Sequence, residues 1–384
     1  MRCLKRSASG FIGSVKRVRI ARVEVFGYGL SYAHGEYVMS GGRTVASLPS
    51  TLVRVTSDSG LEGWGETCPL GPTYLEAHAD GARAALRVLA PALLGVDASN
   101  LHAVQDAMDG ALRGHAYAKS ALDIACWDLL GQALGVPVST LLGGVRSPDF
   151  PLYVAIPLGP AEAMVQHVRD RRAEGVRHFQ LKLGADPRED AARVRAVLEE
   201  DLDVVVADAN GGWRLQDAVI AARALEGLDR VLFEQPCPTL EECLVVRERT
   251  TLPMVLDEVI TDVQTLIRAY GAMEAINLKI GRVGGLTRAR LIRDLGTELG
   301  LRFTIEDSWG GDVTTAAVSH LAASTKPDNL LMASFMNDWT LDHVAGYEPH
   351  SLRGRGAAPT TPGLGLQVDA ERLGAPLESV VWSP

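Results

Sequence analysis

The sequence predicts an α/β fold: a modified (β/α) barrel of the TIM type with an N-terminal α+β capping domain. After residue 149, eight short apolar runs alternate with amphipathic helical segments, which is the rhythm of a parallel (β/α)₈ barrel. Before residue 150, stretches of alternating apolar and polar residues precede long helical segments, a pattern typical of an antiparallel sheet packed on helices. An open α/β sheet would alternate similarly, so the repeat count alone does not exclude it.

The capping domain is expected over residues 18–149. The stretches VRIARVEVFGYG (18–29) and TLVRVTSDSGLEGWGET (51–67) predict antiparallel strands, with a turn at the DSG sequence of residues 58–60. Three helical stretches follow, over residues 78–95, 101–114 and 116–135, and Gly135 marks the end of the last one.

The barrel is expected over residues 150–350, and residues 351–384 are expected to return to the capping domain. Residues 1–17 are basic and lack the apolar core of a signal peptide, so they predict a disordered extension. The eight predicted barrel strands lie within residues 151–157, 178–184, 202–210, 231–236, 253–258, 275–281, 302–309 and 329–335.

Composition excludes several classes of function. The formal net charge of −9 argues against nucleic acid or an anionic membrane as the main partner. No apolar run reaches the roughly 18 residues that a membrane helix needs. The five cysteines form no CxxC pair, which favours a reducing compartment over a disulfide framework. We therefore expect a cytoplasmic protein that acts on a small molecule.

Polar residues end six successive predicted barrel strands. Their spacing of 22 to 28 residues corresponds to one β-loop-α-loop unit each, and the C-terminal ends of barrel strands converge on the face where active sites lie. The sequence therefore predicts a ring of one lysine, three carboxylates, a second lysine and a carboxylate. These residues are Lys182, Asp208, Glu234, Asp257, Lys279 and Asp307.

The three consecutive carboxylates predict a metal site. Asp208, Glu234 and Asp257 cannot all stay ionised in one cleft without a counter-charge. Oxygen ligands without Cys or His suit a hard divalent cation, Mg²⁺ first and Mn²⁺ second. A single acidic residue at a strand end is more often a loop cap or an ion-pair partner, but three on neighbouring strands favour the metal.

The two lysines predict acid–base catalysis. Lys182 and Lys279 flank the carboxylates in sequence, so a barrel would place them on opposite sides of the metal. Desolvation and nearby positive charge can lower a lysine pKa enough for it to act as a base. Opposed lysines could supply one base and one acid, or two bases for epimerisation. The alternative is that each lysine only pairs with a carboxylate.

These residues resemble the enolase superfamily, in particular its muconate-lactonizing-enzyme and mandelate-racemase-like group, over nearly the whole chain. The family's second-strand K-x-K motif corresponds to Gln180-Leu181-Lys182, and Gln180 removes a charge that would help depress the pKa of Lys182. The resemblance implies catalysis by Lys182 and Lys279. The metal ligands that it implies are Asp208, Glu234 and Asp257. A mandelate racemase proper is disfavoured, because Lys279 stands where that enzyme uses an aspartate.

Six further stretches narrow the resemblance to the cis-3-hydroxy-L-proline dehydratases. They are GETCPLGPTY, GHAYAKSALDIACWDLLG, ADANGGW, FEQPCPT, LDEVI and TIEDSWGGD. The resemblance implies a hydro-lyase in which α-proton abstraction through a metal-stabilised enediolate is followed by loss of the 3-hydroxyl. The stretches are similar, less fully, to the epimerases of proline betaine and 4-hydroxyproline betaine, so a racemase or epimerase remains the alternative.

The substrate pocket is expected to contain aromatic and acidic groups. Trp309 could give a cation–π contact to a prolinium nitrogen, although it could equally be a packing residue. Asp307 could accept a hydrogen bond from an imino acid. The resemblance implies that Tyr37 and Tyr74 close over the site from the capping domain. Three further residues, Gln180, Asn210 and Glu258, are expected to orient the ligands or lysines.

Two readings from other classes stay open. A Schiff-base lyase would use a strand-end lysine to form an imine, but it leaves the carboxylate triad unexplained. A non-catalytic binding protein would not need either lysine. The resemblance also implies a homo-oligomer, and the sequence does not decide which lysine takes the proton.

Overall fold

The computed structural model describes residues 17–383, and a closed barrel of eight parallel strands forms its larger part. The predicted (β/α) barrel is thereby confirmed, and every predicted apolar run contains a strand. Neighbouring strands follow one another in chain order, and a parallel bridge between Leu152 and Ala333 joins the first strand region to the last. The strands are β7 (Tyr153–Ile156), β8 (His178–Lys182), β9 (Val204–Asp208), β10 (Val231–Glu234), β11 (Met254–Leu256), β12 (Ala275–Lys279), β13 (Arg302–Glu306) and β14 (Leu330–Ala333).

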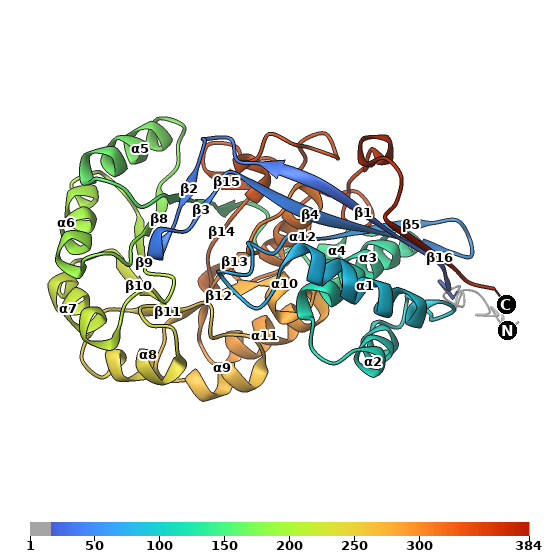
Figure 1. The fold of residues 1–384 in the computed structure, drawn as a ribbon, viewed down its shortest axis with the longest axis horizontal. Helices are drawn as coiled ribbons and strands as arrows, with labels where there is room; N and C mark the ends of the chain where they lie inside the picture. Colours follow the sequence, from blue (N-terminus) through green and yellow to red (C-terminus); the bar gives the residue numbers. More distant parts are fainter. Residues whose placement is uncertain (1–16, 384) are drawn as a thin grey trace, which may run out of the picture.

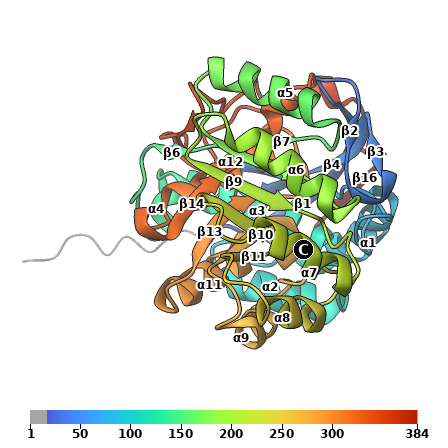
Figure 2. The ribbon, with the colours of Figure 1, turned by 90° about the vertical axis from the view of Figure 1, so that its left-hand side faces the viewer.

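Helices surround the barrel on its outside (Figures 1 and 2). They bury their apolar faces against the strands, as amphipathic crossover helices do. The eighth strand differs from a complete (β/α)₈ pattern, because β14 leads into the short 3₁₀ helix η3 (Met336–Trp339) instead of an α-helix. The barrel helices are α5 (Ala161–Ala173), α6 (Pro187–Leu198), α7 (Leu215–Leu225), α8 (Leu240–Arg247), α9 (Val263–Ala269), α10 (Ile280–Val283), α11 (Leu286–Glu298) and α12 (Asp312–Ala323), with the 3₁₀ helix η2 (Pro327–Asn329) before β14.

The capping domain packs a four-stranded antiparallel sheet, in the order β16-β1-β4-β5, against helices. Figure 1 shows its long strands β1 and β4 running from this domain towards the barrel. The small β2–β3 hairpin lies between them in sequence. The elements are β1 (Ile20–Ser31), β2 (Tyr37–Val38), η1 (Ser40–Gly42), β3 (Thr44–Val45), β4 (Ser47–Ser57), β5 (Glu62–Thr67), α1 (Ala79–Leu93), α2 (Leu101–Ala111), α3 (Ala116–Leu134) and α4 (Val138–Leu141).

The C-terminal segment touches both domains. Strand β15 (Arg355–Gly356) pairs with β6 (Phe150–Pro151) beside the barrel, and after η4 (Ala370–Leu373) strand β16 (Glu378–Val381) pairs with β1. The predicted basic extension, apart from Arg17, lies outside the described residues. Within residues 17–383, none of the helices has the length and hydropathy needed to span a bilayer. The four described cysteines are buried free thiols.

Three buried carboxylates of the capping domain order the chain around it, and two of them hold the capping domain on the barrel. Asp123 accepts hydrogen bonds from the backbone N–H and the hydroxyl of Thr287, at the start of α11. Glu66 accepts from the backbone N–H groups of Gly311 and Thr314, at the start of α12. Helix N-termini present unpaired N–H groups and favour negative charge, so these contacts fix the capping domain relative to the barrel.

The third carboxylate, Asp128, acts inside the capping domain and on the C-terminal segment. Its two oxygens accept from the backbone N–H groups of Trp64 and Leu364, at 2.8 and 2.7 Å. Burial raises the pKa of Asp128 to about 6. One side chain on α3 thus positions both β5 and the returning chain.

Strand β5 packs against α3 with almost no space between their backbones, because two glycines face the helix. A Cβ atom on Gly65 would lie 1.8 Å from the carbonyl oxygen of Ala121, and one on Gly63 would lie 2.2 Å from that of Ala125. Only glycine allows this approach.

We predict that Gly65→Ala destabilises the protein by at least about 2 kcal/mol, because β5 must move away from α3 to relieve the overlap. Urea unfolding followed by circular dichroism measures the change. Gly29→Ala is the matched control, since a Cβ on this strand glycine meets its nearest neighbour only at 4.0 Å. Equal stability of the two variants would contradict the close packing.

Candidate active site

The predicted strand-end residues meet at one end of the barrel. Lys182, Asp208, Glu234 and Lys279 are the last residues of β8, β9, β10 and β12, and Asp257 directly follows β11. All five side chains are buried. The parallel strands are in register here, so that Lys182 lies beside Asp208. The structure therefore brings together, in one place, charges that the sequence separates by almost 100 residues.

Each lysine pairs with a carboxylate of the triad. Nζ of Lys182 donates to Oδ2 of Asp208 at 2.5 Å, and Nζ of Lys279 donates to Oδ2 of Asp257 at 2.9 Å. Burial alone would lower the pKa of Lys182, but the Asp208 carboxylate outweighs burial and the pKa is raised. In this arrangement Lys182 is a cation, and loss of its ion pair with Asp208 would lower its pKa, so that the neutral form that can accept a proton becomes accessible.

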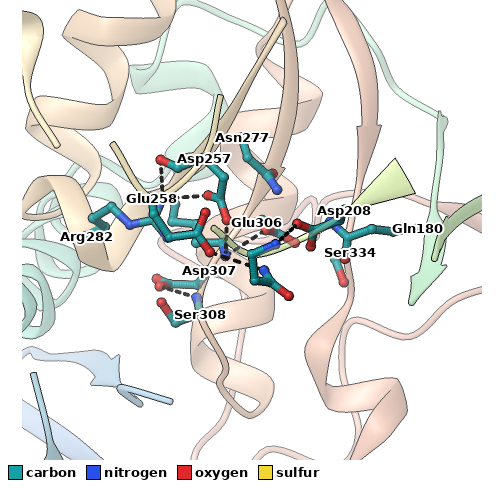
Figure 3. Close-up of polar contacts among 12 residues, drawn as sticks. Gln180, Asp208, Asp257, Glu258, Asn277, Arg282, Glu306, Asp307, Ser308 and Ser334 are labelled. Carbon is teal, nitrogen blue, oxygen red and sulfur yellow. Dashed lines mark hydrogen bonds and ion pairs between the residues drawn. The ribbon is translucent and has the colours of Figure 1, made fainter. Parts of the chain in front are cut away.

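Glu234 lies between the two lysine-bearing strands and is held by amides instead of cations. The side-chain amide of Gln180 donates to both of its oxygens at 3.1 Å, and that of Asn277 donates to Oε1 at 2.8 Å. Burial and the neighbouring carboxylates Asp208 and Asp257 raise the pKa of Glu234 well above its ordinary value. Figure 3 labels Gln180 and Asn277, the two amides that donate to Glu234, together with Asp208 and Asp257.

Gln180 and Asn277 occupy equivalent positions two residues before the lysines. Side chains two apart in a strand point to the same face, so each strand places an amide deeper in the barrel and a lysine nearer the mouth. Gln180 was predicted as an orienting residue. Asn277 was missed by the sequence analysis, although its spacing from Lys279 is the same as that of Gln180 from Lys182.

Arg282 is a site residue that the strand pattern does not indicate. It lies on the short helix α10, and its Nη1 donates to Oδ1 and to the backbone oxygen of Asp257 at 2.5 and 2.8 Å. Burial alone would raise the pKa of Asp257, but Arg282 and then Lys279 outweigh it and hold the pKa below its ordinary value. Nη2 of Arg282 also donates to the hydroxyl of Tyr74, at 3.1 Å.

On strand β13 the charged residue that contacts a lysine is Glu306, which the sequence analysis did not name as a site residue. Oε1 of Glu306 lies 3.3 Å from Nζ of Lys279. The predicted Asp307 instead accepts from the backbone N–H groups of Gly281 and Ser308, each at 2.7 Å. Burial raises the pKa of Asp307 to about 6. The register pairs Lys279 with Glu306, which explains why Glu306 faces the lysine.

A small cavity joins these groups to the capping domain. Trp309 lies in its wall, with its ring centroid 5.4 Å from Tyr37 and 5.7 Å from Trp339 in edge-on contacts, so it both packs and faces the cavity. The lining residues are Tyr37, Met39, Leu70, Tyr74, Tyr153, Gln180, Lys182, Asn210, Lys279, Glu306, Asp307, Ser308, Trp309, Met336 and Trp339. The predicted pocket residues Tyr37, Tyr74, Asp307 and Trp309 are therefore all part of one cavity wall.

Asn210 and Glu258 lie beside the carboxylates. The backbone N–H of Asn210 donates to Oδ1 of Asp208 at 2.7 Å, and its side-chain amide donates to Oε1 of Glu258 at 3.1 Å. Asn210 has a φ of 46°, a conformation that asparagine tolerates better than most residues. Within the described chain, Oδ1 of Asn210 and Oε2 of Glu258 are buried oxygens without a hydrogen-bond partner.

The donor set fits a hard divalent cation. Asp208, Glu234 and Asp257 offer only oxygen atoms, and the two unpartnered oxygens nearby could bind its water ligands. Among residues 17–383, no three acidic, histidine or cysteine side chains are arranged to hold an ion as they stand. The reason is local, because Lys182, Lys279 and Arg282 occupy the oxygens of Asp208 and Asp257.

Comparison with known protein families matches both domains. Residues 34–143 match the mandelate racemase/muconate lactonizing enzyme N-terminal domain, and residues 163–372 match the enolase C-terminal domain-like family. The two models together cover most of the described chain, and the second one contains all five strand-end residues discussed above.

Individual relatives align over most of their length. The chain is 45% identical to a cis-3-hydroxy-L-proline dehydratase of Roseibium aggregatum, over 94% of this chain and 99% of that protein. It is 28% identical to an N-succinyl-L-Arg/Lys racemase of Bacillus cereus, over 76% and 80%. A crystal structure of an enolase superfamily member from Roseovarius nubinhibens ISM, complexed with magnesium, is 38% identical, with a TM-score of 0.89 and coverage of 95% and 100%.

We predict that Glu234→Gln raises the stability of the metal-free protein at pH 8 by about 1–2 kcal/mol. The raised pKa of Glu234 means that its ionised form costs folding free energy; this cost is absent below the pKa of the unfolded chain and grows as the pH rises. A neutral amide of the same size removes it. Thermal unfolding in a chelating buffer measures the difference.

Glu200→Gln is the control, because Glu200 forms ordinary ion pairs with Arg169 and Arg172 outside the cluster. A metal-free Glu234→Gln variant that is less stable than the parent at pH 8 would refute the electrostatic account of the triad.

Proposed function

The chain belongs to the mandelate racemase/muconate lactonizing enzyme family of the enolase superfamily, and from this premise we propose that it is a cis-3-hydroxy-L-proline dehydratase. The observation that carries the proposal is the similarity to the Roseibium aggregatum dehydratase over nearly the full length of both chains. The proposed reaction breaks the bond between C2 and its proton and the bond between C3 and its hydroxyl. The enamine that forms then tautomerises to Δ1-pyrroline-2-carboxylate.

Lys182 and Lys279 are the proposed acid–base pair. Both line the same cavity, and they come from the second and the sixth barrel strand, so a substrate between them would expose one ring face to each. In cis-3-hydroxy-L-proline the hydroxyl shares a face with the carboxylate, and the α-proton is on the other face. A base on one side and an acid on the other therefore match the geometry of an anti elimination.

Asp208, Glu234 and Asp257 are the proposed ligands of Mg²⁺, with Mn²⁺ as the second choice. A bound cation would supply positive charge to the substrate carboxylate and so make the α-proton more acidic. With a cation bound, Gln180 and Asn277 would hold Glu234, and Arg282 would hold Asp257. Asp208 would turn to the cation, so that Lys182 would lose the carboxylate that keeps it protonated.

The aromatic wall of the cavity suits a compact cationic ring. Trp309 contacts Tyr37 and Trp339 edge to face, whereas Tyr37 and Trp339 stack on each other. We propose that their ring surface receives a prolinium nitrogen by cation–π attraction. Tyr74 donates to Asp257 at 3.2 Å and accepts from Lys279 at 2.9 Å. We propose that Tyr37 and Tyr74, both from the capping domain, exclude water from the site. We also expect a cytoplasmic, homo-oligomeric enzyme.

Epimerisation of a proline-type amino acid or betaine is the second candidate. It needs the same lysine pair, with one lysine removing the proton and the other returning it to the opposite face. The similarity to the Bacillus cereus racemase favours this alternative, but that similarity is lower and covers less of the chain than the one to the dehydratase.

Proton NMR in D₂O with Mg²⁺ tests the two candidates. We expect cis-3-hydroxy-L-proline signals to be replaced by those of Δ1-pyrroline-2-carboxylate. Proline betaine and 4-hydroxyproline betaine are offered separately. Deuterium at C2 of a betaine, without elimination, would assign the epimerase instead.

Lys182→Met and Lys279→Met test the role of the lysines in the same assay. Each variant should lose turnover by at least about a hundredfold, which is the lower range for a lost acid or base. Full activity in either variant would remove that lysine from the mechanism, and full activity in both would exclude lysine catalysis altogether.

Metal binding has a readout that does not require turnover. Adding Mg²⁺ should raise the thermal unfolding midpoint of the parent protein, because an ion at about 100 times its dissociation constant stabilises the native state by about 2.7 kcal/mol. Glu234→Gln should lose most of this increase, whereas Glu200→Gln should retain it. An unchanged midpoint in the parent at millimolar Mg²⁺ would argue against the site.

A further inference from the structure

Glu306 lies in the cavity wall, at the end of the strand next to the one that carries Lys279. The proposed ligands come from strands β9 and β10 and the end of β11, whereas Glu306 ends β13. Its Oε2 accepts from the hydroxyl of Tyr153 on β7, and its Oε1 lies 3.3 Å from Nζ of Lys279. Figure 3 shows Glu306 among the charged groups of the cluster.

Burial and Asp307 favour the neutral form of Glu306, and together they outweigh the nearby ammonium group of Lys279. The side chain is 1% exposed, and burial followed by the neighbouring Asp307 raises the pKa of Glu306 well above its ordinary value. A neutral carboxyl group carries one proton that it can donate. A group buried in this way is a common source of protons in active sites at neutral pH.

The Lys279 ammonium group is held by three neighbouring oxygen atoms. An ammonium group has three N–H donors. Those of Lys279 have three partners within reach, namely Oδ2 of Asp257 at 2.9 Å, the hydroxyl of Tyr74 at 2.9 Å and Oε1 of Glu306 at 3.3 Å. Glu306 therefore lies on the Lys279 side of the cavity, as a second group that could deliver a proton there.

We propose that Glu306 is the general acid that protonates the departing 3-hydroxyl group, with Tyr153 and Lys279 holding its carboxyl group in place. This inference rests on the proposed dehydratase function and revises one role in it: Glu306, in place of Lys279, gives a proton to the leaving hydroxyl, and Lys279 positions Glu306. The base on the opposite ring face is then Lys182.

The step balances in atoms and electrons. Lys182 in its neutral form takes the proton from C2, and the electron pair of that bond passes to the substrate carboxylate, giving an enediolate. In the second step this electron pair forms the double bond between C2 and C3. The bond between C3 and oxygen breaks, its electron pair leaves with the oxygen, and the proton of Glu306 completes a water molecule. Lys182 ends protonated and Glu306 ends ionised, and exchange with solvent after product release restores both.

A different role for Glu306 would be that of a counter-ion for the ring nitrogen. An ionised Glu306 would then bind the prolinium group, and its removal would weaken binding and slow every step after it. The two roles differ in what happens to the α-proton, because a counter-ion is needed for proton exchange and for elimination alike.

Glu306→Gln, assayed by proton NMR with cis-3-hydroxy-L-proline, Mg²⁺ and D₂O, separates these roles. We expect dehydration to fall by about 10²- to 10⁴-fold, the usual contribution of a general acid. Exchange at C2 should continue, so recovered substrate should gain deuterium before it is dehydrated. Glu200→Gln, the same change in a half-buried glutamate outside the cavity, should behave as the parent in both reactions.

Three outcomes overturn the proposal: loss of exchange and dehydration by the same factor, unchanged dehydration, or a raised KM as the main effect. If Glu306→Gln does not fold, Tyr153→Phe replaces it and should lower the ratio of dehydration to exchange by about tenfold, the value of one hydrogen bond; an unchanged ratio would then overturn the proposal. A parent protein that exchanges the α-proton but never dehydrates contradicts the dehydratase function itself, which the parent spectrum alone reveals.

Discussion

The gathering of buried carboxylates at the mouth of the barrel is the constraint on which the rest of the site depends. Three acidic side chains within one desolvated cluster are unfavourable unless cations balance them. The protein provides this balance with Lys182, Lys279 and Arg282, and it surrounds the central Glu234 with amide donors. Two of these cations, Lys182 and Lys279, would give up their carboxylate partners if a metal ion took over the negative charge, whereas Arg282 would stay on Asp257. The pairing of the two lysines with Asp208 and Asp257 would thus stabilise the metal-free protein and also place the lysines for catalysis.

The capping domain matters to this chemistry because it supplies groups that the barrel lacks. Tyr74 reaches the Asp257–Lys279–Arg282 cluster through its hydroxyl, and Tyr37 packs on Trp309. These tyrosines can hold their positions only if the two domains keep a fixed relation. Asp123 and Glu66 secure it by filling the N-terminal ends of barrel helices with buried negative charge. The carboxylates of Asp123 and Glu66, which lie outside the cavity, therefore control the positions of the tyrosines within it.

Much of this could be predicted from sequence, because a barrel strand is short, apolar and ends at the functional face. The eight strands and the five charged strand-end residues follow from that rule. The finer details do not. On the seventh strand, two adjacent carboxylates compete for one position, and only the strand register decides that Glu306 faces Lys279. Arg282 lies on the short helix α10, which has no periodic apolar pattern. The 3₁₀ helix η3 replaces an α-helix after β14, and no apolar pattern in the sequence indicates this replacement. The catalytic and ligand roles of these residues stay predictions.

The pairing of β16 with β1 joins segments from opposite ends of the described chain. During synthesis, the barrel segments emerge before residues 378–381 exist, so the outer edge of β1 stays uncovered while the strands of the barrel can already pair. Such long-range pairings close late, because the chain between them must first be ordered. Folding during synthesis would therefore form the barrel before the capping sheet is complete. Until β16 is made, β1 has an unpaired edge, which is the surface that a chaperone would have most reason to protect.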